Sequence, residues 1–511
     1  MTDELVRLAN AVLWPGFLGT EAPDWLLAEL RDGLAGAVYF SQNVGNGLPA
    51  LSDEILRANP DALIGIDEEG GNVTRLESAA GSTLPGAAQL GIVDDVDATR
   101  DSGAELARRV ASVGVNVVLG PVADVNTDPR NPVIGVRSFG SDEELVARHV
   151  QAAVDGLQSN AVAACVKHFP GHGDTHLDSH HALPEISLDI AEYESVHLEP
   201  FRAAIAAGVD AIMTAHIVVP AWGAEPATLN PRVLGMLRDW GFDGVIISDA
   251  LDMAAIRETV GIGQGAARAL AAGVDLLCIG NPTNRGEATL PDQDRRDFLA
   301  ARDGILAAVS DGSLPRERLA AAAQRVARLA ETLRTRATTA PPVGYDGSEI
   351  VRRAITGATA DAEALAVVDA RRRSTLAVDS ASAYVAQTLA ADGHRVRVDV
   401  ARSSIDEQDS ALERAVLAEG LTVILLDRPD ADDAQRSLVE RAALRDPEAV
   451  VVNVGLAARR PLPLPVVEVG SASRIGAQAA RDRLTGGASH RAVRSPASAG
   501  PVSYTHLPAP Q

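Results

Sequence analysis

Eight short apolar runs, each followed by a stretch in which apolar residues recur at helical spacing, divide the first 335 residues of this 511-residue chain. Alternation of strand-like and helical segments is typical of repeated βα units that build a parallel sheet. Eight such units predict an α/β fold with a (β/α)8 barrel. The runs are AVLWPGFLG from Ala11, GAVYF from Gly36, DALIGID from Asp61, GVNVVLGP from Gly114, AVAACVKHF from Ala161, DAIMTAH from Asp210, GVIISD from Gly244 and VDLLCIG from Val274.

Titratable side chains close four of these runs. DALIGID ends in Asp67, AVAACVKHF carries Lys167 and His168 near its end, DAIMTAH ends in His216, and GVIISD ends in Asp249. A single polar residue at a strand end is ordinarily a turn former. In such barrels, however, the carboxyl ends of the strands meet at one mouth, where the chemistry lies. Four polar strand ends therefore predict a chemical site at that mouth.

The pattern breaks near residue 335, where TRATTAPPVGYDGSE predicts a linker over 335–349 after a barrel domain of residues 1–334. Beyond it, residues 350–486 predict an α/β sandwich with a mostly parallel sheet and without a phosphate-binding glycine loop. The tail 487–511 is rich in Ser, Pro and Ala, and we expect it to be disordered. The second domain's runs are STLAVDS, a helix-like AYVAQTLAADG, HRVRVDV, LTVILLD, EAVVVNV and PVVEVG.

The charge of the chain limits its partners. A formal net charge of -23 argues against nucleic acid and anionic membranes, which are bound mainly by clustered basic residues. Asp3 and Glu4 stand where a secretory signal would carry Lys or Arg, and no apolar run approaches the roughly 18 residues of a membrane helix. We therefore expect a cytoplasmic protein, with Cys165 and Cys278 as free buried thiols.

Residues 167–184, KHFPGHGDTHLDSHHALP, hold the chain's one lysine and five of its eleven histidines. Four of those histidines recur every fourth residue, a spacing that on a helix would suggest a zinc site. Pro170, Gly171 and Gly173 oppose a continuous helix there. We therefore expect no metal, although a metal-dependent barrel hydrolase stays an alternative.

A strand end followed by a glycine-bearing loop explains this segment better. Lys167 and His168 would be held at the mouth, while the loop with Asp178 and His180 would cover bound substrate. A carboxylate bonded to one imidazole nitrogen fixes the tautomer and raises the basicity of the other nitrogen. Asp178 and His180 are therefore predicted to form a general acid/base pair.

Five stretches, in order, resemble the motifs of the glycoside hydrolase family 3 β-N-acetylglucosaminidases. KHFPGHG followed by DSH is the most specific of them, since it is similar to the hexosaminidase branch and unlike the family's β-glucosidases. The second domain resembles the carboxyl-terminal domain of two-domain members only loosely. The stretches are IDEEGGNVTRL (66–76), NPVIGVRSFG (131–140), KHFPGHGDTHLDSH (167–180), MTAHI (213–217) and SDALDM (248–253).

The resemblance implies that Asp249 is the nucleophile and that His180 is the acid/base, oriented by Asp178. Retaining glycosidases usually use two carboxyl groups, so here an imidazole would replace the second. Sugar hydroxyls and an acetamide carbonyl need fixed polar partners. By the same resemblance, those partners are Asp67, Arg75, Arg137, Lys167 and His168.

Four further polar residues lie near predicted strand ends. We expect Glu68, Glu69 and Asp124 to bind basic side chains such as Arg75 and to take no direct part in catalysis. His216 is predicted either to support the site or to be a core histidine with satisfied hydrogen bonds.

The leading hypothesis is a retaining exo-β-N-acetylglucosaminidase without cofactor or metal. By resemblance, its substrates would be muropeptide fragments from peptidoglycan recycling or chitooligosaccharides with a terminal GlcNAc. One alternative is a phosphorylase, because a neutral imidazole repels an incoming phosphate less than a carboxylate would. A β-glucosidase of the same family and a non-catalytic sugar-binding protein are further alternatives.

Overall fold

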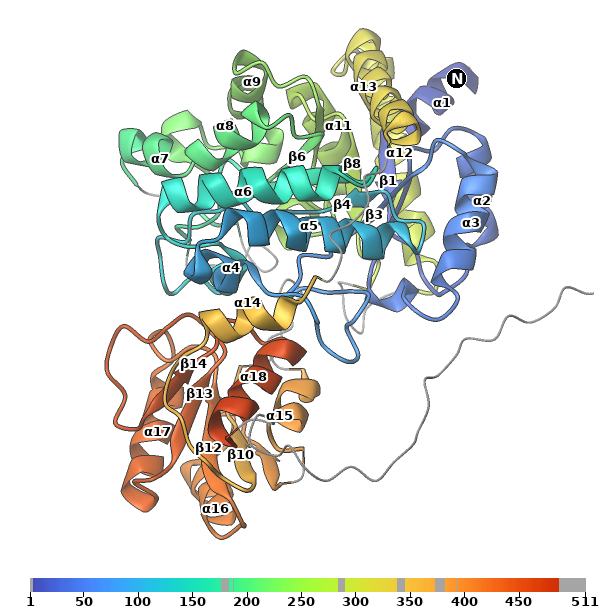
Figure 1. Ribbon diagram of the computed structural model, residues 1–511. Helices are drawn as coiled ribbons and strands as arrows, with labels where there is room; N and C mark the ends of the chain where they lie inside the picture. The colour runs from blue at the N-terminus through green and yellow to red at the C-terminus, as the bar shows by residue number, and fades with distance from the viewer. Residues whose placement is uncertain are drawn as a thin grey trace, which may run out of the picture.

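Eight parallel strands surrounded by helices form the larger part of the molecule, and a smaller α/β unit packs beside it (Figure 1). The computed structural model describes residues 3–175, 183–186, 188–283, 290–337, 345–372, 382–391 and 393–486. Each of the eight predicted runs contains one barrel strand, so that prediction is confirmed. The strands are β1 (Leu13–Pro15), β2 (Gly36–Tyr39), β3 (Leu63–Ile66), β4 (Val117–Val118), β5 (Ala163–Phe169), β6 (Ala211–Thr214), β7 (Val245–Ile247) and β8 (Leu277–Gly280).

The strands follow one another around the barrel in chain order. β2 to β7 pair as one parallel sheet, and β8 pairs in parallel with β1. A parallel bridge between Ile247 and Leu276 joins β7 to β8, and β1 packs beside β2. This order closes the expected (β/α)8 barrel and brings all eight carboxyl ends to one mouth.

An apolar cluster with members from all eight strand runs lies inside the barrel. Trp14 is fully buried there, and its indole Nε1 donates to the Leu63 carbonyl at 2.7 Å. A Cβ at residue 65 would lie 2.3 Å from the indole ring, so Gly65 is required for this packing. Cys165 and Cys278 belong to the same cluster as free buried thiols, as the sequence predicts.

Helices cover the outside of the barrel, and several begin at a side-chain cap. Asp95 accepts from the Ala98 amide and Asp142 from the Leu145 amide, which satisfies donors that the first helical turn leaves unpaired. No helix in the described ranges is both long and apolar enough to cross a bilayer. The helical elements are α1 (Asp3–Asn10), α2 (Asp24–Arg31), η1 (Ser41–Asn43), α3 (Leu48–Ala58), α4 (Ala87–Val93), α5 (Val96–Ala111), η2 (Gly135–Arg137), α6 (Glu143–Gln158), α7 (Ile190–Val196), α8 (Glu199–Ala206), η3 (Pro220–Trp222), η4 (Ala227–Leu229), α9 (Pro231–Asp239), α10 (Ala254–Arg257), α11 (Ile262–Ala272), α12 (Gln293–Asp311) and α13 (Arg316–Thr335).

The smaller part, which we call the C-terminal unit, is one sheet with helices on its faces (Figure 1). Its strand order is β11-β10-β12-β13-β14-β9, parallel except for β9, which pairs antiparallel to β14. Its strands are β9 (Thr356–Gly357), β10 (Leu365–Asp369), β11 (Arg395–Arg397), β12 (Leu421–Leu426), β13 (Val450–Asn453) and β14 (Val466–Glu468). Its helices are α14 (Gly347–Ala354), α15 (Ala383–Leu389), α16 (Ile405–Val416), α17 (Asp433–Arg445) and α18 (Arg474–Leu484).

Most predicted elements of the C-terminal unit are present. HRVRVDV, LTVILLD, EAVVVNV and PVVEVG contain β11 to β14, and AYVAQTLAADG contains α15. The sequence did not predict β9 or β10. β10 was missed because LAVVD follows the Ala-rich stretch ATADAEA, whose composition favours a helix. STLAVDS, the predicted first strand, lies outside the described residues.

The two parts of the molecule join through α14 and the loops around it. α14 packs against α4 of the barrel and against α18, and Gln89 Nε2 donates to the Val469 carbonyl at 2.9 Å. Residues 338–344 of the predicted linker and the whole tail 487–511 lie outside the described residues. The domain limits 1–334 and 350–486 stay a prediction.

Candidate active site

Lys167 joins the ends of two barrel strands. It lies in β5 with 3% of its side chain exposed, and its Nζ lies 2.7 Å from Asp67 Oδ1 and 2.8 Å from Glu69 Oε1. Asp67 directly follows β3, and Glu69 lies two residues further on. The lone lysine of the chain is therefore a buried ion-pair partner at the mouth of the barrel.

Glu69 links this lysine to the loop that follows β4. Arg137, in η2, donates from Nε to Oε2 at 2.9 Å and from Nη2 to Oε1 at 2.7 Å of the same carboxylate. Arg75 lies on the other side, with Nη2 3.5 Å from Asp67 Oδ2. The structure thus brings together four of the five predicted sugar-binding residues, around a glutamate that the sequence had not assigned to Lys167 or Arg137.

These groups keep each other charged. Burial alone would lower the pKa of Lys167, but the carboxylates of Asp67 and Glu69 outweigh it and raise that pKa. Burial alone would raise the pKa of Asp67, but Lys167 and Arg75 hold it below its usual range. The same opposition, through Arg137 and Lys167, lowers the pKa of Glu69. The mouth therefore offers fixed charged donors and acceptors at neutral pH.

His168, the fifth predicted sugar-binding residue, is held by Asp124. Its Nδ1 lies 2.7 Å from Asp124 Oδ2, and Asp124 Oδ1 accepts the His172 amide at 2.7 Å. Asp124 is fully buried; burial would raise its pKa, but His168 outweighs this and lowers it. A carboxylate at Nδ1 fixes the proton there and leaves Nε2 as an acceptor in the neutral ring. Asp124 therefore binds a basic side chain, as expected, but that side chain is His168.

Among the described residues, Glu68 forms no ion pair with a basic side chain, contrary to our expectation. Its Oε2 accepts the backbone amides of Arg75 at 2.8 Å and Leu76 at 3.0 Å. Burial raises the pKa of Glu68 to about 7. Glu68 therefore shapes the loop 67–76 and so sets the position of Arg75.

Asp249 lies two residues after the end of β7 and is partly exposed. Its amide donates to Thr214 Oγ1 at 3.2 Å, and its Oδ1 accepts the Ala250 amide at 2.8 Å. Burial raises the pKa of the Cys165 thiol inside the barrel. Lys167 lowers that pKa while Asp67 and Asp249 raise it, so all three charges act on one point of the barrel interior.

The other predicted catalytic residues, Asp178 and His180, lie outside the described residues, as does the whole segment 176–182 of the loop predicted to cover the substrate. His172 is described, and its Nδ1 lies 2.8 Å from Thr175 Oγ1. Burial lowers the pKa of His172 to about 4. Because His168 lies in β5 and His172 in the following loop, their fourfold spacing is not helical. Among the described residues, no three His, Cys, Asp or Glu side chains are placed to share a metal ion.

The C-terminal unit holds the loop 67–76 from outside. Asn72 Oδ1 accepts the Ala472 amide at 2.7 Å and the Ser471 hydroxyl at 3.0 Å. Gly71 has a φ of 56°, and a Cβ there would lie 2.5 Å from the Gly86 backbone. Only glycine fits this close approach without strain. The loop that carries Asp67, Glu69 and Arg75 is therefore fixed from both parts of the molecule.

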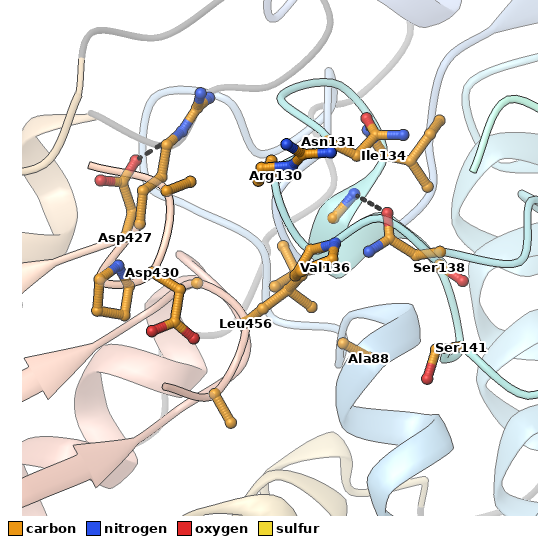
Figure 2. A pocket seen from close by; sticks show the side chains of 18 of the residues that line it. Ala88, Arg130, Asn131, Ile134, Val136, Ser138, Ser141, Asp427, Asp430 and Leu456 are labelled. Atoms are coloured by element: carbon orange, nitrogen blue, oxygen red, sulfur yellow. Dashed lines mark hydrogen bonds and ion pairs between the residues drawn. The ribbon is translucent and has the colours of Figure 1, made fainter. Parts of the chain in front are cut away.

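A hollow of about 390 Å³ lies between the barrel and the C-terminal unit (Figure 2). One wall is the loop after β4, with Asn131 and Val136, and the other comes from loops after β12 and β13, with Asp427 and Leu456. No predicted site residue in the described ranges lines it, so we place the candidate active site at the strand ends. Asn131 Nδ2 donates to the His172 carbonyl at 2.8 Å, so one loop borders both places.

A (β/α)8 barrel whose mouth carries carboxylates, a buried lysine and a histidine held by a carboxylate has the groups that a glycosidase needs to bind and cleave a sugar. Residues 50–329 match the family described as "Glycosyl hydrolase family 3 N terminal domain". The chain belongs to glycosyl hydrolase family 3 and is one of its β-hexosaminidases, so the resemblance seen in the sequence is confirmed.

Several relatives support this membership. A β-hexosaminidase of Chromobacterium violaceum is 38% identical over 289 residues, which cover 54% of this chain and 79% of that protein. "Beta-hexosaminidase A" of Pseudoalteromonas piscicida is 31% identical over 332 residues, 59% of this chain but only 54% of that protein. The solved structure of a glycoside hydrolase family 3 β-N-acetylglucosaminidase from Paenibacillus sp. str. FPU-7 superposes with a TM-score of 0.80 at 30% identity. That superposition covers 95% of this chain, and so includes its C-terminal unit, and 97% of the other chain.

Proposed function

We propose that the protein is a retaining exo-β-N-acetylglucosaminidase that removes terminal β-linked GlcNAc from muropeptide or chitooligosaccharide fragments. The observation that carries this proposal is the mouth of the barrel. Asp67 and Asp249 lie there just after the ends of β3 and β7, and Lys167 lies near the end of β5. The solved Paenibacillus relative is described as a β-N-acetylglucosaminidase, which supports the choice of sugar.

The proposed reaction has two displacement steps. Asp249 attacks the anomeric carbon while His180, oriented by Asp178, gives a proton to the leaving oxygen. His180 then takes a proton from water, which attacks the glycosyl-enzyme from the face that the aglycone left. Two inversions at the same carbon give net retention. Asp249 suits the first step because its backbone is anchored two residues after a barrel strand, where its amide donates to Thr214 Oγ1.

The remaining predicted residues are proposed to bind the sugar. Lys167 and Arg137 supply donors, and Asp67 supplies an acceptor for hydroxyl groups. The ion pairs already hold these side chains in place, so little conformational entropy is lost when sugar binds. Arg75 and His168 complete the set, as the family resemblance implies.

Turnover of a chromogenic GlcNAc glycoside tests the proposal, with the released sugar identified with and without phosphate. We expect free GlcNAc at the same rate in both buffers and the β-anomer as the first product by NMR. Formation of GlcNAc-1-phosphate would show that the enzyme is a phosphorylase and not a hydrolase. An α-anomer as the first product would exclude a retaining mechanism. A glucoside turned over as fast as the GlcNAc glycoside would identify a β-glucosidase instead.

A further inference from the structure

The backbone around Asp249 is tied to its two neighbouring strands in different ways. Toward β8 the ladder of backbone hydrogen bonds continues past the end of β7. Leu251 N donates to the Cys278 carbonyl at 3.0 Å, and Asp252 N donates to the Ile279 carbonyl at 3.1 Å. Toward β6 the pairing stops at Met213 and Ile247. Buried backbone groups beyond that point need other partners.

Three side chains supply partners on the β6 side. The Asp249 amide donates to Thr214 Oγ1 at 3.2 Å, and the Ala250 carbonyl lies 2.9 Å from His216 Nε2. Thr228, in η4, connects these two contacts: its Oγ1 lies 2.8 Å from Thr214 Oγ1 and 2.8 Å from His216 Nδ1. Thr214, His216 and Thr228 are all fully buried.

The chemistry of the groups sets the direction of these bonds. A carbonyl oxygen only accepts, so His216 Nε2 carries a proton and donates to Ala250. In the neutral ring Nδ1 then accepts from the Thr228 hydroxyl, which shares its one proton between this nitrogen and the Ala215 carbonyl oxygen 3.0 Å away. That leaves Thr228 Oγ1 to accept from Thr214, whose own oxygen accepts the Asp249 amide. The chain therefore runs unbroken from the amide of Asp249 to the carbonyl of Ala250.

We propose that Thr214, Thr228 and His216 are positioning residues for Asp249. They hold the Asp249 amide and the Ala250 carbonyl in place beyond the last backbone pairing with β6. The proposal rests on the function proposed above, in which Asp249 is the nucleophile. A displacement of 1 Å in a reacting group can lower a rate about 100-fold, so a loosened Asp249 backbone should lower kcat.

The test compares two substitutions of Thr228 that remove different atoms. Thr228→Val keeps the shape but loses the hydroxyl, whereas Thr228→Ser keeps the hydroxyl but loses the methyl group. We expect Thr228→Val to lower kcat for an aryl GlcNAc glycoside by about 10- to 100-fold, with KM changed less than about twofold. We expect Thr228→Ser to keep kcat within about threefold of the wild type.

The chain offers a matched control in the outer helices of the barrel. Thr99 on α5 and His149 on α6 are buried, and Thr99 Oγ1 lies 2.7 Å from His149 Nδ1, as in the Thr228–His216 pair. Thr99→Val should lower the melting temperature comparably to Thr228→Val but leave kcat unchanged. If the loss of kcat were caused only by lower stability of the fold, it would appear in both variants.

Each outcome decides the proposal. It is overturned if Thr228→Val keeps wild-type kcat, if Thr228→Ser loses as much kcat as the valine variant, or if Thr99→Val is equally impaired. If Thr228→Val does not fold, Thr214→Val and Thr214→Ser make the same comparison at the next link. Asp249→Ala separates this proposal from the function: an active Asp249→Ala enzyme refutes the nucleophile itself. An inactive one, with wild-type kcat in Thr228→Val, refutes only the positioning chain.

Discussion

Lys167 Nζ lies 2.7 Å from Asp67 Oδ1, although 100 residues separate the two in the chain. Both side chains are largely buried, and Glu69 forms the second ion pair of the lysine. Removing one partner of a buried pair leaves an uncompensated charge in a site of low polarity. The stability of the barrel mouth therefore depends on the same ammonium group that we propose to bind the sugar.

Lys167→Met should lower the free energy of unfolding by about 3–5 kcal/mol, because Asp67 loses its nearest cation. It should also lower kcat/KM for a GlcNAc glycoside by at least ~100-fold, if the ammonium group binds the sugar. Urea denaturation and steady-state kinetics measure the two effects. The double variant Lys167→Met, Asp67→Asn should recover part of the stability without recovering activity. A single variant with wild-type stability would contradict the ion-pair account.

Asp249→Ala should abolish turnover and leave the fold intact, because Asp249 is proposed to form the covalent intermediate. Kinetics with an aryl GlcNAc glycoside measure the loss, and circular dichroism checks the fold. A variant that retains more than a few per cent of wild-type activity removes Asp249 from the mechanism.

Glu68→Gln should change how stability depends on pH. Burial raises the pKa of Glu68 from its ordinary value of 4.5 to about 7, so the folded state binds more protons than the unfolded state between these values. Wild-type stability relative to the glutamine variant should therefore fall as pH rises through this window, by up to ~3 kcal/mol, and stay low above it. Urea denaturation of both proteins at pH 5 and pH 8 measures the difference.

The Glu68→Gln variant must be compared with the wild type, because His172 changes the free energy of unfolding with pH in the opposite direction. Burial lowers its pKa from 6.5 to about 4, so its contribution to stability is present above pH 6.5 and is lost as pH falls toward 4. His172 is the same in both proteins and cancels in the difference. Glu144→Gln, at an exposed position on α6, is the matched control and should leave the pH dependence unchanged. An unchanged pH dependence in Glu68→Gln would show that burial does not raise this pKa.

The barrel could be predicted because each of its strands is a separate apolar run bounded by turn residues. The strand-end positions of Asp67, Lys167 and Asp249 could be predicted for a related reason, since a charged group at the end of a buried apolar run stands out in the sequence. β10 could not be predicted, because its five residues follow an Ala-rich stretch whose composition favours a helix. The sequence pattern therefore predicts a strand well only where an apolar run differs clearly from the residues on either side of it.

The contacts between loops could not be predicted in this way. Glu69 meets Arg137 across 68 residues, and nothing near either residue indicates the partner. Thr228 lies in a short helical turn, where a threonine is an ordinary turn residue, and its contact with His216 exists only once η4 packs on the end of β6. Such pairings depend on the closure of the barrel.

The acid/base assignment of His180 predicts a dependence on the leaving group. His180→Ala should slow cleavage of natural disaccharides by roughly 10² to 10⁴, the usual contribution of general acid catalysis. Aryl glycosides with acidic phenols should be slowed less in the glycosylation step, because such a leaving group departs without a proton. Asp178→Ala should give the same pattern more weakly, since the imidazole remains but loses its orienting carboxylate. Pre-steady-state rates for a series of phenols measure the slope, and equal slowing of good and poor leaving groups would mean that another group, such as His176, His181 or Asp174, is the acid.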